Sequence, residues 1–191
     1  MMPLYRRGLY IKMRKLPKII TKEEFEKIFK AADNVKRIPK KRIKKMKVAM
    51  LLGFEAGMRI SEIVGFKDRV PRLTQQKVDM QGNKIFITEG KGKKDRIVPL
   101  PKRFNKTAYN LLPIDVERRT LQRFVTNLGK KVLGKDISFH TLRHGFATRL
   151  IDSGVPLHEV QGLMGHSRLD TTGIYLHANP TKAIEAARDA F

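Results

Sequence analysis

The chain of 191 residues contains no cysteine. This absence excludes disulfide bonds, thiolate metal sites and a cysteine nucleophile, and it agrees with a reducing, cytoplasmic environment. No run of apolar residues approaches the length that spans a membrane. Lysine interrupts the apolar residues near the N-terminus, so this segment lacks the apolar core of a signal peptide. We therefore expect no membrane partner.

Acidic residues are also scarce. Asp and Glu number 18 against 41 Lys and Arg, which gives a formal net charge of +23. A charge of this size repels itself in a compact fold, so a polyanionic partner is the expected compensation. An anionic membrane would attract it too, but no amphipathic basic helix with an aromatic face is found, which favours nucleic acid. The charge alone does not distinguish DNA from RNA, or an enzyme from a binding protein.

The hydrophobic pattern predicts a mainly α chain with one small antiparallel β-sheet, an α+β fold. Residues 18–191 form one predicted domain, and residues 1–17 form a basic arm or linker before it. Thr21 and Glu24 have the spacing of a capping box, which predicts a helix start, while Gly57 and Gly154 predict the ends of two later helices. Segments 83–88 and 95–100 are predicted hairpin strands, with 75–79 as a third strand.

Two basic segments are predicted to contact phosphates. Residues 33–47 are rich in lysine and contain Pro39, so we expect a loop, with a merely solvated loop as the alternative. The second is the hairpin loop EGKGKK. The predicted contact residues are Lys40, Lys41, Arg42, Lys44, Lys45, Lys93 and Lys94.

Five segments carry residues suited to attack on a phosphodiester. Such an attack needs fixed positive donors on the phosphate oxygens, a nucleophile held in line, and an acid for the departing oxygen. Arginine suits the donor role because its planar fork grips two oxygens and stays protonated. In HTLRHGFATRL, His140 and Arg143 are three residues apart and project from one helix face. Arg59 stands at a helix start, with Glu62 within reach to orient it.

Other interpretations of these side chains remain open. His140 and His144 have the spacing of a metal pair, but no third ligand has a convincing position, so we predict no metal and a supporting role for His144. Tyr175, taken alone, would be a core tyrosine of an amphipathic helix. Lys91 lies between two glycines that allow a close approach to DNA, although Lys93 and Lys94 share its loop.

Five motifs in order, GMRISEI, EGKGKKDRIVPL, HTLRHGFATRL, LMGH and TTGIYLH, resemble the catalytic domain of tyrosine recombinases, the phage-integrase and Xer group. The resemblance covers roughly residues 18–185 and implies that family's catalytic-domain fold. It implies that Arg59 is the first catalytic arginine, supported by Glu62, and that Lys91 protonates the leaving 5′-oxygen. It further implies the remaining catalytic set, with no metal or other cofactor: His140, Arg143, His166 and the nucleophile Tyr175.

The resemblance also implies the partners. Tyr175 would form a 3′-phosphotyrosyl link to double-stranded DNA, and the chain would act as a homo-oligomer, a tetrameric synapse on DNA that is monomeric when free. We expect it on the nucleoid, with the family's N-terminal core-binding domain absent from this chain. Two alternatives are a type IB topoisomerase-like nicking and relaxing activity and a DNA-binding module without chemistry.

Overall fold

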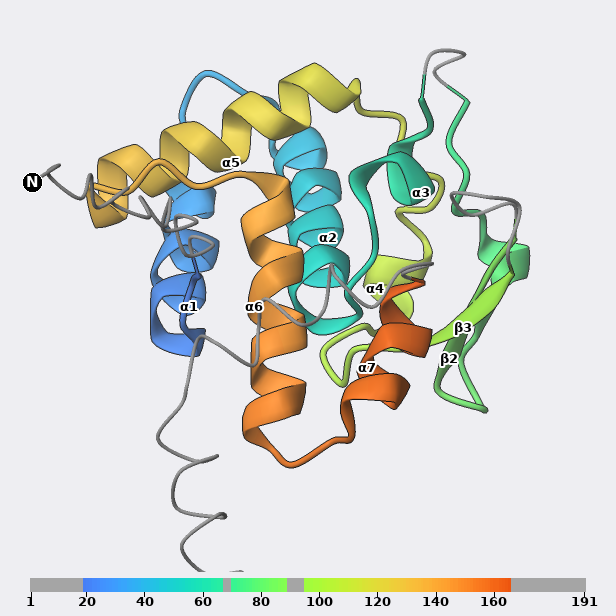
Figure 1. The fold of residues 1–191 in the computed structure, drawn as a ribbon. Coiled ribbons are helices and arrows are strands. Elements are labelled where there is room, and N and C mark those ends of the chain that lie inside the picture. Colours follow the sequence, from blue (N-terminus) through green and yellow to red (C-terminus); the bar gives the residue numbers. More distant parts are fainter. Residues whose placement is uncertain (1–18, 67–69, 89–94, 166–191) are drawn as a thin grey trace, which may run out of the picture.

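The computed structural model describes residues 19–66, 70–88 and 95–165, which pack around one main hydrophobic core and a smaller second cluster. At the centre, α2 (Lys40–Glu55) and α6 (Phe139–Asp152) lie side by side (Figure 1). Helix α1 (Lys22–Ala31) packs against α2, and α5 (Arg118–Leu133) lies across the ends of these helices. The helical architecture agrees with the predicted fold class.

The start of α1 confirms the predicted capping box. The Thr21 hydroxyl accepts a hydrogen bond from the Glu24 amide at 3.2 Å, and the Glu24 carboxylate accepts one from the Thr21 amide at 3.2 Å. These bonds satisfy amides that a helix start otherwise leaves unpaired. The helix buries Phe25, whose ring stacks on Phe54 of α2 with centroids 3.9 Å apart. The cap and the stacked rings together fix α1 against the core.

The prediction of a loop over residues 33–47 is wrong from Lys40 onward. Helix α2 begins at Lys40, directly after Pro39, and a short 3-10 helix, η1 (Ala32–Asn34), precedes it. Proline interrupts a helix from within, but just before the first turn its missing amide costs nothing. The basic residues therefore project from a helix whose later turns are apolar and buried. Lys45 is no longer a free cation, because it forms an ion pair with Asp115 at 2.6 Å.

The chain turns sharply between α2 and α3 (Ile60–Val64), as the glycine predicted. Gly57 has a φ of +64°, a conformation that residues with a Cβ rarely adopt. A Cβ at this position would also collide with the ring of Phe146 on α6. The turn therefore brings the start of α3 close to α6.

The two predicted hairpin strands are confirmed. The third strand, predicted over 75–79, is confirmed only for Val78–Asp79, because the polar residues Gln75–Lys77 form a 3-10 helix, η2, instead. Strands β1 (Val78–Asp79), β2 (Lys84–Ile87) and β3 (Arg96–Pro99) are antiparallel in the order β1-β2-β3. Ile87 pairs with Arg96, so these two residues stand at the end of the strands nearest residues 89–94. Side chains alternate along each strand, with Ile85, Ile87 and Val98 buried. The short helix η2 contacts β2, and the short helix α4 (Lys106–Tyr109) follows the sheet in the sequence.

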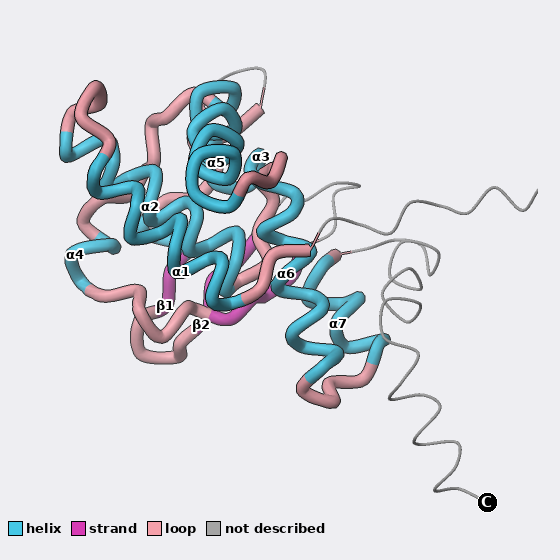
Figure 2. Tube along the Cα trace, turned by 90° about the vertical axis from the view of Figure 1, so that its left-hand side faces the viewer, coloured by secondary structure: helices cyan, strands magenta, loops and turns pink. Residues whose placement is uncertain are grey.

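The last described helix, α7 (Leu157–Met164), packs against α6 in the second apolar cluster, formed by Phe146, Ala147, Val160 and Met164. Figure 2 shows α7 beside the lower end of α6, away from α1 and α5. Gly165 follows α7 with a φ of +59°, the left-handed conformation that ends many helices. The amphipathic helix considered around Tyr175 lies outside the described residues. Among the described helices, none combines the length and apolar character needed to cross a membrane.

Candidate active site

The structure brings together five of the predicted site residues: Arg59, Glu62, His140, Arg143 and His144. Arg59 is the residue before the first turn of α3, and Glu62 lies in that turn, while His140 and Arg143 project from the first turns of α6. Five others lie outside the described residues, and their roles stay predictions: Lys91, Lys93, Lys94, His166 and Tyr175.

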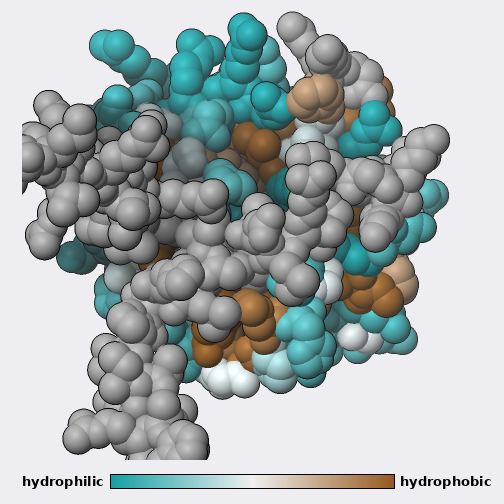
Figure 3. All heavy atoms as spheres, in the orientation of Figure 1, coloured by the Kyte–Doolittle hydropathy of each residue, from teal (hydrophilic) through white to brown (hydrophobic). Residues whose placement is uncertain are grey.

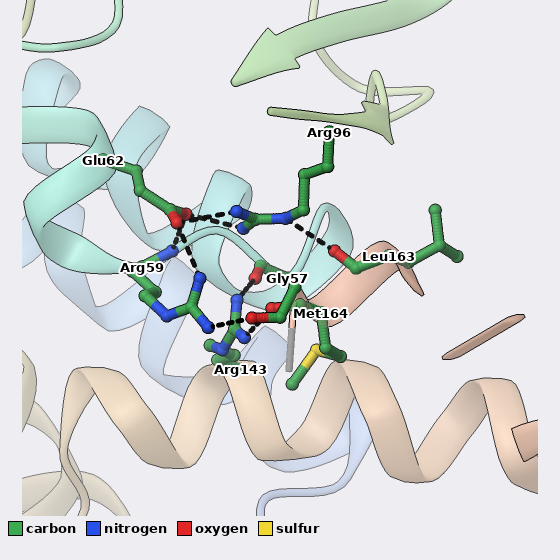
Figure 4. A network of polar contacts seen from close by, with 8 residues as sticks. Gly57, Arg59, Glu62, Arg96, Arg143, Leu163 and Met164 are labelled. Atoms are coloured by element: carbon green, nitrogen blue, oxygen red, sulfur yellow. Dashed lines mark hydrogen bonds and ion pairs between the residues drawn. The ribbon is translucent and has the colours of Figure 1, made fainter. Parts of the chain in front are cut away.

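The Glu62 carboxylate is the centre of a buried polar network (Figure 4). One oxygen accepts hydrogen bonds from Arg59 Nη1 and Arg96 Nη1, each at 2.8 Å. The other accepts from the Arg59 amide at 2.7 Å and from Arg96 Nη2 at 2.8 Å. Burial by itself raises the pKa of Glu62, but the hydrogen bonds and charges of Arg96 and Arg59 outweigh it and hold this pKa below its usual value. Glu62 is therefore an anion that fixes two guanidinium groups.

Three arginines from three elements meet the last carbonyl groups of α7. Arg96 Nε donates to the Leu163 carbonyl at 2.9 Å, and Arg59 Nη2 donates to the Gly165 carbonyl at 2.8 Å. Arg143 Nη2 donates to the Met164 carbonyl between them. Carbonyls at a helix C-terminus lack partners within the helix and favour positive charge. The end of α7 is therefore held by Arg59 and Arg143, which are predicted to grip a phosphate, and by Arg96, which was not.

Arg143 is buried more deeply than Arg59. It is 1% exposed, and its Nη1 donates to the carbonyl of Gly57 (Figure 4). The Arg59 side chain is 20% exposed. Arg59 therefore keeps some contact with solvent, whereas Arg143 is enclosed by protein.

The His140 ring lies beside these cations and keeps contact with solvent. Partial desolvation, followed by the charges of Arg143 and Arg59, lowers the pKa of His140. Its ring packs edge-on against that of His144, with centroids 4.2 Å apart. Across residues 19–66, 70–88 and 95–165, no three His, Asp or Glu side chains gather as metal ligands. This part of the chain thus supplies no third ligand for the alternative metal pair.

Sequence reasoning missed Arg96, the second partner of Glu62. Its side chain is 7% exposed and lies two residues from the buried Val98 on the same strand. Residues two apart share a face of a strand, so the pattern places a charge on the apolar face. A buried charge requires a partner, and this requirement is the signal that would have identified Arg96.

A second group of cations was not predicted, because its residues belong to none of the five motifs. Arg118, Arg119 and Arg123 are exposed on the first turns of α5 and line a hollow with Ile60, next to Arg59. Gln122, in the same hollow, accepts a hydrogen bond from the amide of Phe139 at 3.1 Å, beside His140. The start of α5 therefore borders the candidate site on the side of both Arg59 and His140.

Comparison with known proteins identifies the family of this chain. A model of the phage integrase family matches residues 18–182. The tyrosine recombinase XerA of Pyrococcus horikoshii is 32% identical over 195 residues, and the match covers 93% of this chain and 62% of that protein. This chain thus spans less than two thirds of the length of that relative.

Two solved structures share the fold. The XerH site-specific recombinase, in a pre-cleavage complex with its difH substrate, gives a TM-score of 0.71 at 24% identity, over 93% of this chain and 55% of that one. The catalytic domain of the bacteriophage HP1 integrase gives 0.61 at 22% identity, over 90% of this chain and 94% of that one. Because the family model covers most of the sequence and the fold agrees with it, the chain belongs to the phage integrase family.

Proposed function

We propose that this chain cuts and rejoins double-stranded DNA as a site-specific recombinase or integrase, with Tyr175 as the nucleophile. One observation carries the proposal. Arg59 and Arg143 come from separate segments and converge on adjacent carbonyls at the end of α7, one residue before His166. Two fixed guanidinium groups are what the non-bridging oxygens of an attacked phosphate require.

The chemistry balances without a cofactor. The Tyr175 hydroxyl gives its proton to water and its oxygen attacks phosphorus. A phosphotyrosyl bond forms, and the bond to the 5′-oxygen breaks. Lys91 gives a proton to that oxygen, which leaves as a hydroxyl group. The phosphotyrosyl link keeps a phosphodiester bond, so the reverse attack by a 5′-hydroxyl rejoins a strand. If the 5′-hydroxyl that attacks comes from a second DNA duplex, the strands are exchanged and the DNA is recombined.

The remaining roles follow from the charges at the site. The lowered pKa of His140 keeps its ring neutral near pH 7, where one nitrogen accepts a hydrogen bond and the other donates one. We assign His140 to hold the attacked phosphate and the incoming tyrosine, and His166 to donate to a phosphate oxygen. Glu62 keeps Arg59 in place and does not contact DNA.

A basic surface leads away from the site and supports DNA as the partner. Arg42 on α2 lines one hollow with Arg118 and Arg119, and these two line the next hollow with Ile60 beside Arg59. Figure 3 shows hydrophilic side chains crowded along the edge that α5 forms. Asp115, in the first hollow, is paired with Lys45. We propose that a DNA backbone follows this surface, and that four copies assemble on it in the cytoplasm during strand exchange.

The proposal is tested by trapping the covalent intermediate. A nicked suicide duplex, drawn from a random pool, is incubated with the protein in EDTA, and denaturing gels reveal any protein–DNA link. Wild type and the control Tyr109→Phe are expected to give a band, and Tyr175→Phe none, with equal DNA binding.

Other results separate the alternatives. A band that survives Tyr175→Phe contradicts the assigned nucleophile. No band in wild type, with DNA binding intact, favours a binding module without chemistry. Relaxation of a supercoiled plasmid without strand exchange between two sites favours the topoisomerase-like activity.

A further inference from the structure

We propose that Arg96 is a positioning residue of this active site: it locks the Glu62–Arg59 pair to the end of α7 and does not itself touch DNA. This inference rests on the proposed function. Arg96 lies on β3, whereas Arg59 precedes α3 and Leu163 lies on α7, so one side chain connects three separate elements. Figure 4 shows its guanidinium group between the Glu62 carboxylate and the Leu163 carbonyl.

The contacts of Arg96 make it a brace for Glu62. Its two terminal nitrogens bind the two Glu62 oxygens at 2.8 Å each, while Nε binds the Leu163 carbonyl at 2.9 Å. With 7% of the side chain exposed, little surface remains for a duplex to reach. A bidentate contact fixes the plane of the carboxylate as well as its distance. The orientation of Glu62, and through it that of Arg59, therefore depends on Arg96.

The same side chain also fixes the end of α7. A Cβ added to Gly165 would meet Arg96 Cδ at 3.0 Å and Nη1 at 3.1 Å, so this backbone lies directly against the guanidinium group. The next two carbonyls along the chain receive Arg143 and Arg59. A shift of Arg96 would therefore move the acceptors of both predicted phosphate-binding arginines together.

Arg96→Lys tests the brace, because lysine keeps the charge but loses the planar fork and the Nε donor. The matched control is Arg103→Lys, which changes an arginine bound to Glu55 and Glu26 outside the site. In single-turnover cleavage of a suicide duplex at saturating DNA, we expect Arg96→Lys to lower the rate constant at least tenfold. We expect its Kd for DNA to stay within twofold, and both values to be unchanged in Arg103→Lys.

A double-mutant cycle separates positioning from general loss of structure. If Arg96 acts through Glu62, adding Arg96→Lys to Glu62→Gln lowers the rate by less than twofold further. The proposal is overturned if the two substitutions together lower the cleavage rate by the product of their separate effects. It is also overturned if the folded fraction of Arg96→Lys cleaves as fast as wild type.

A measurement on the protein alone keeps the inference separate from the proposed function. In nitrogen-15 spectra, the guanidinium protons of Arg59 should exchange with water slowly in wild type and at least tenfold faster in Arg96→Lys. If wild type fails to cleave DNA, the proposed function fails and this comparison still decides the role of Arg96. If Arg96→Lys fails to fold, fast exchange at Arg59 in wild type overturns the inference, and slow exchange at both Arg59 and Arg96 supports it.

Discussion

At the scale of the residue, the site depends on one carboxylate. Glu62 is 8% exposed and accepts four hydrogen bonds from Arg59 and Arg96. The spacing of Arg59 and Glu62 along the sequence predicted their contact, and the structure confirms it. Arg96 was not predicted, because it is 34 residues from Glu62 and only the folded hairpin brings the two together.

Glu62→Gln should destabilise the protein by about 3 kcal/mol at pH 7, because it leaves buried guanidinium charge without its counterion. The lowered pKa of Glu62 adds stability above the pKa of the unfolded carboxyl group, and this stability is lost as the pH falls through the folded value. Urea unfolding at pH 7 and pH 3 measures both effects. The difference in the free energy of unfolding between wild type and variant should be smaller at pH 3.

Glu26→Gln is the matched control. Glu26 pairs with Arg103 at a more exposed position, where an ion pair contributes about 1 kcal/mol or less. Equal losses for the two variants would contradict the central place of Glu62.

The imidazole of His140 should titrate below 6.5, the ordinary histidine value. Desolvation and the charges of Arg143 and Arg59 disfavour its protonated form, so the pKa should rise in Arg59→Met. The corresponding stability is present above the unfolded pKa and is lost as the pH falls through the folded one. Proton NMR of the ring measures the pKa, with the urea-unfolded chain as reference. A pKa above that reference would place His140 away from these cations.

At the scale of the element, the turn at Gly57 sets where the candidate catalytic side chains meet. The sequence predicted the breaks at Gly57 and Gly154 because glycine adopts positive φ at little cost. Where α2 begins, the sequence pattern predicted a loop instead. Proline is equally typical of a break within a segment and of the position before a helix. The choice between the two depends on whether the following turns bury an apolar face. Here they do, because Ile43 and Met46 are buried.

Gly57→Ala should cost about 2–5 kcal/mol of stability, from left-handed strain together with overpacking against the buried Phe146 ring. Gly154→Ala is the control, since Gly154 also has a positive φ but a Cβ there would meet nothing within 4 Å. Strain alone should cost about 1–2 kcal/mol there. Denaturant unfolding of both variants measures the difference, and equal losses would show that Phe146 yields to the added methyl group.

At the scale of the whole molecule, the net charge of +23 is distributed over several surfaces, and composition cannot show which of them meets DNA. The motifs predicted the family because they stand in its order and with its usual spacings, and the hydrophobic pattern predicted the mainly helical fold. The arginines of α5 carry no such motif, and only the packing of α5 beside α3 and α6 shows that they border the site.

Binding to DNA should weaken steeply with salt, with a slope of about −0.9 in log K against log salt for each neutralised phosphate. Three exposed lysines lie at the start of α2: Lys40, Lys41 and Lys44. Replacing all three with glutamine should reduce the magnitude of that slope by about two to three. The control replaces three exposed lysines of α1, with the same change in net charge: Lys22, Lys27 and Lys30. Fluorescence anisotropy in graded salt measures the slopes, and equal slopes for the two triple variants would show that α2 does not contact DNA.

The central claim is that Tyr175 becomes covalently bound to DNA, and the most direct test identifies the linked residue. The trapped complex is digested with nuclease and trypsin, and mass spectrometry locates the peptide that carries a nucleotide on a 3′-phosphate. We expect a single modified residue, Tyr175. A nucleotide on Tyr5, Tyr10, Tyr109 or any other side chain would contradict it.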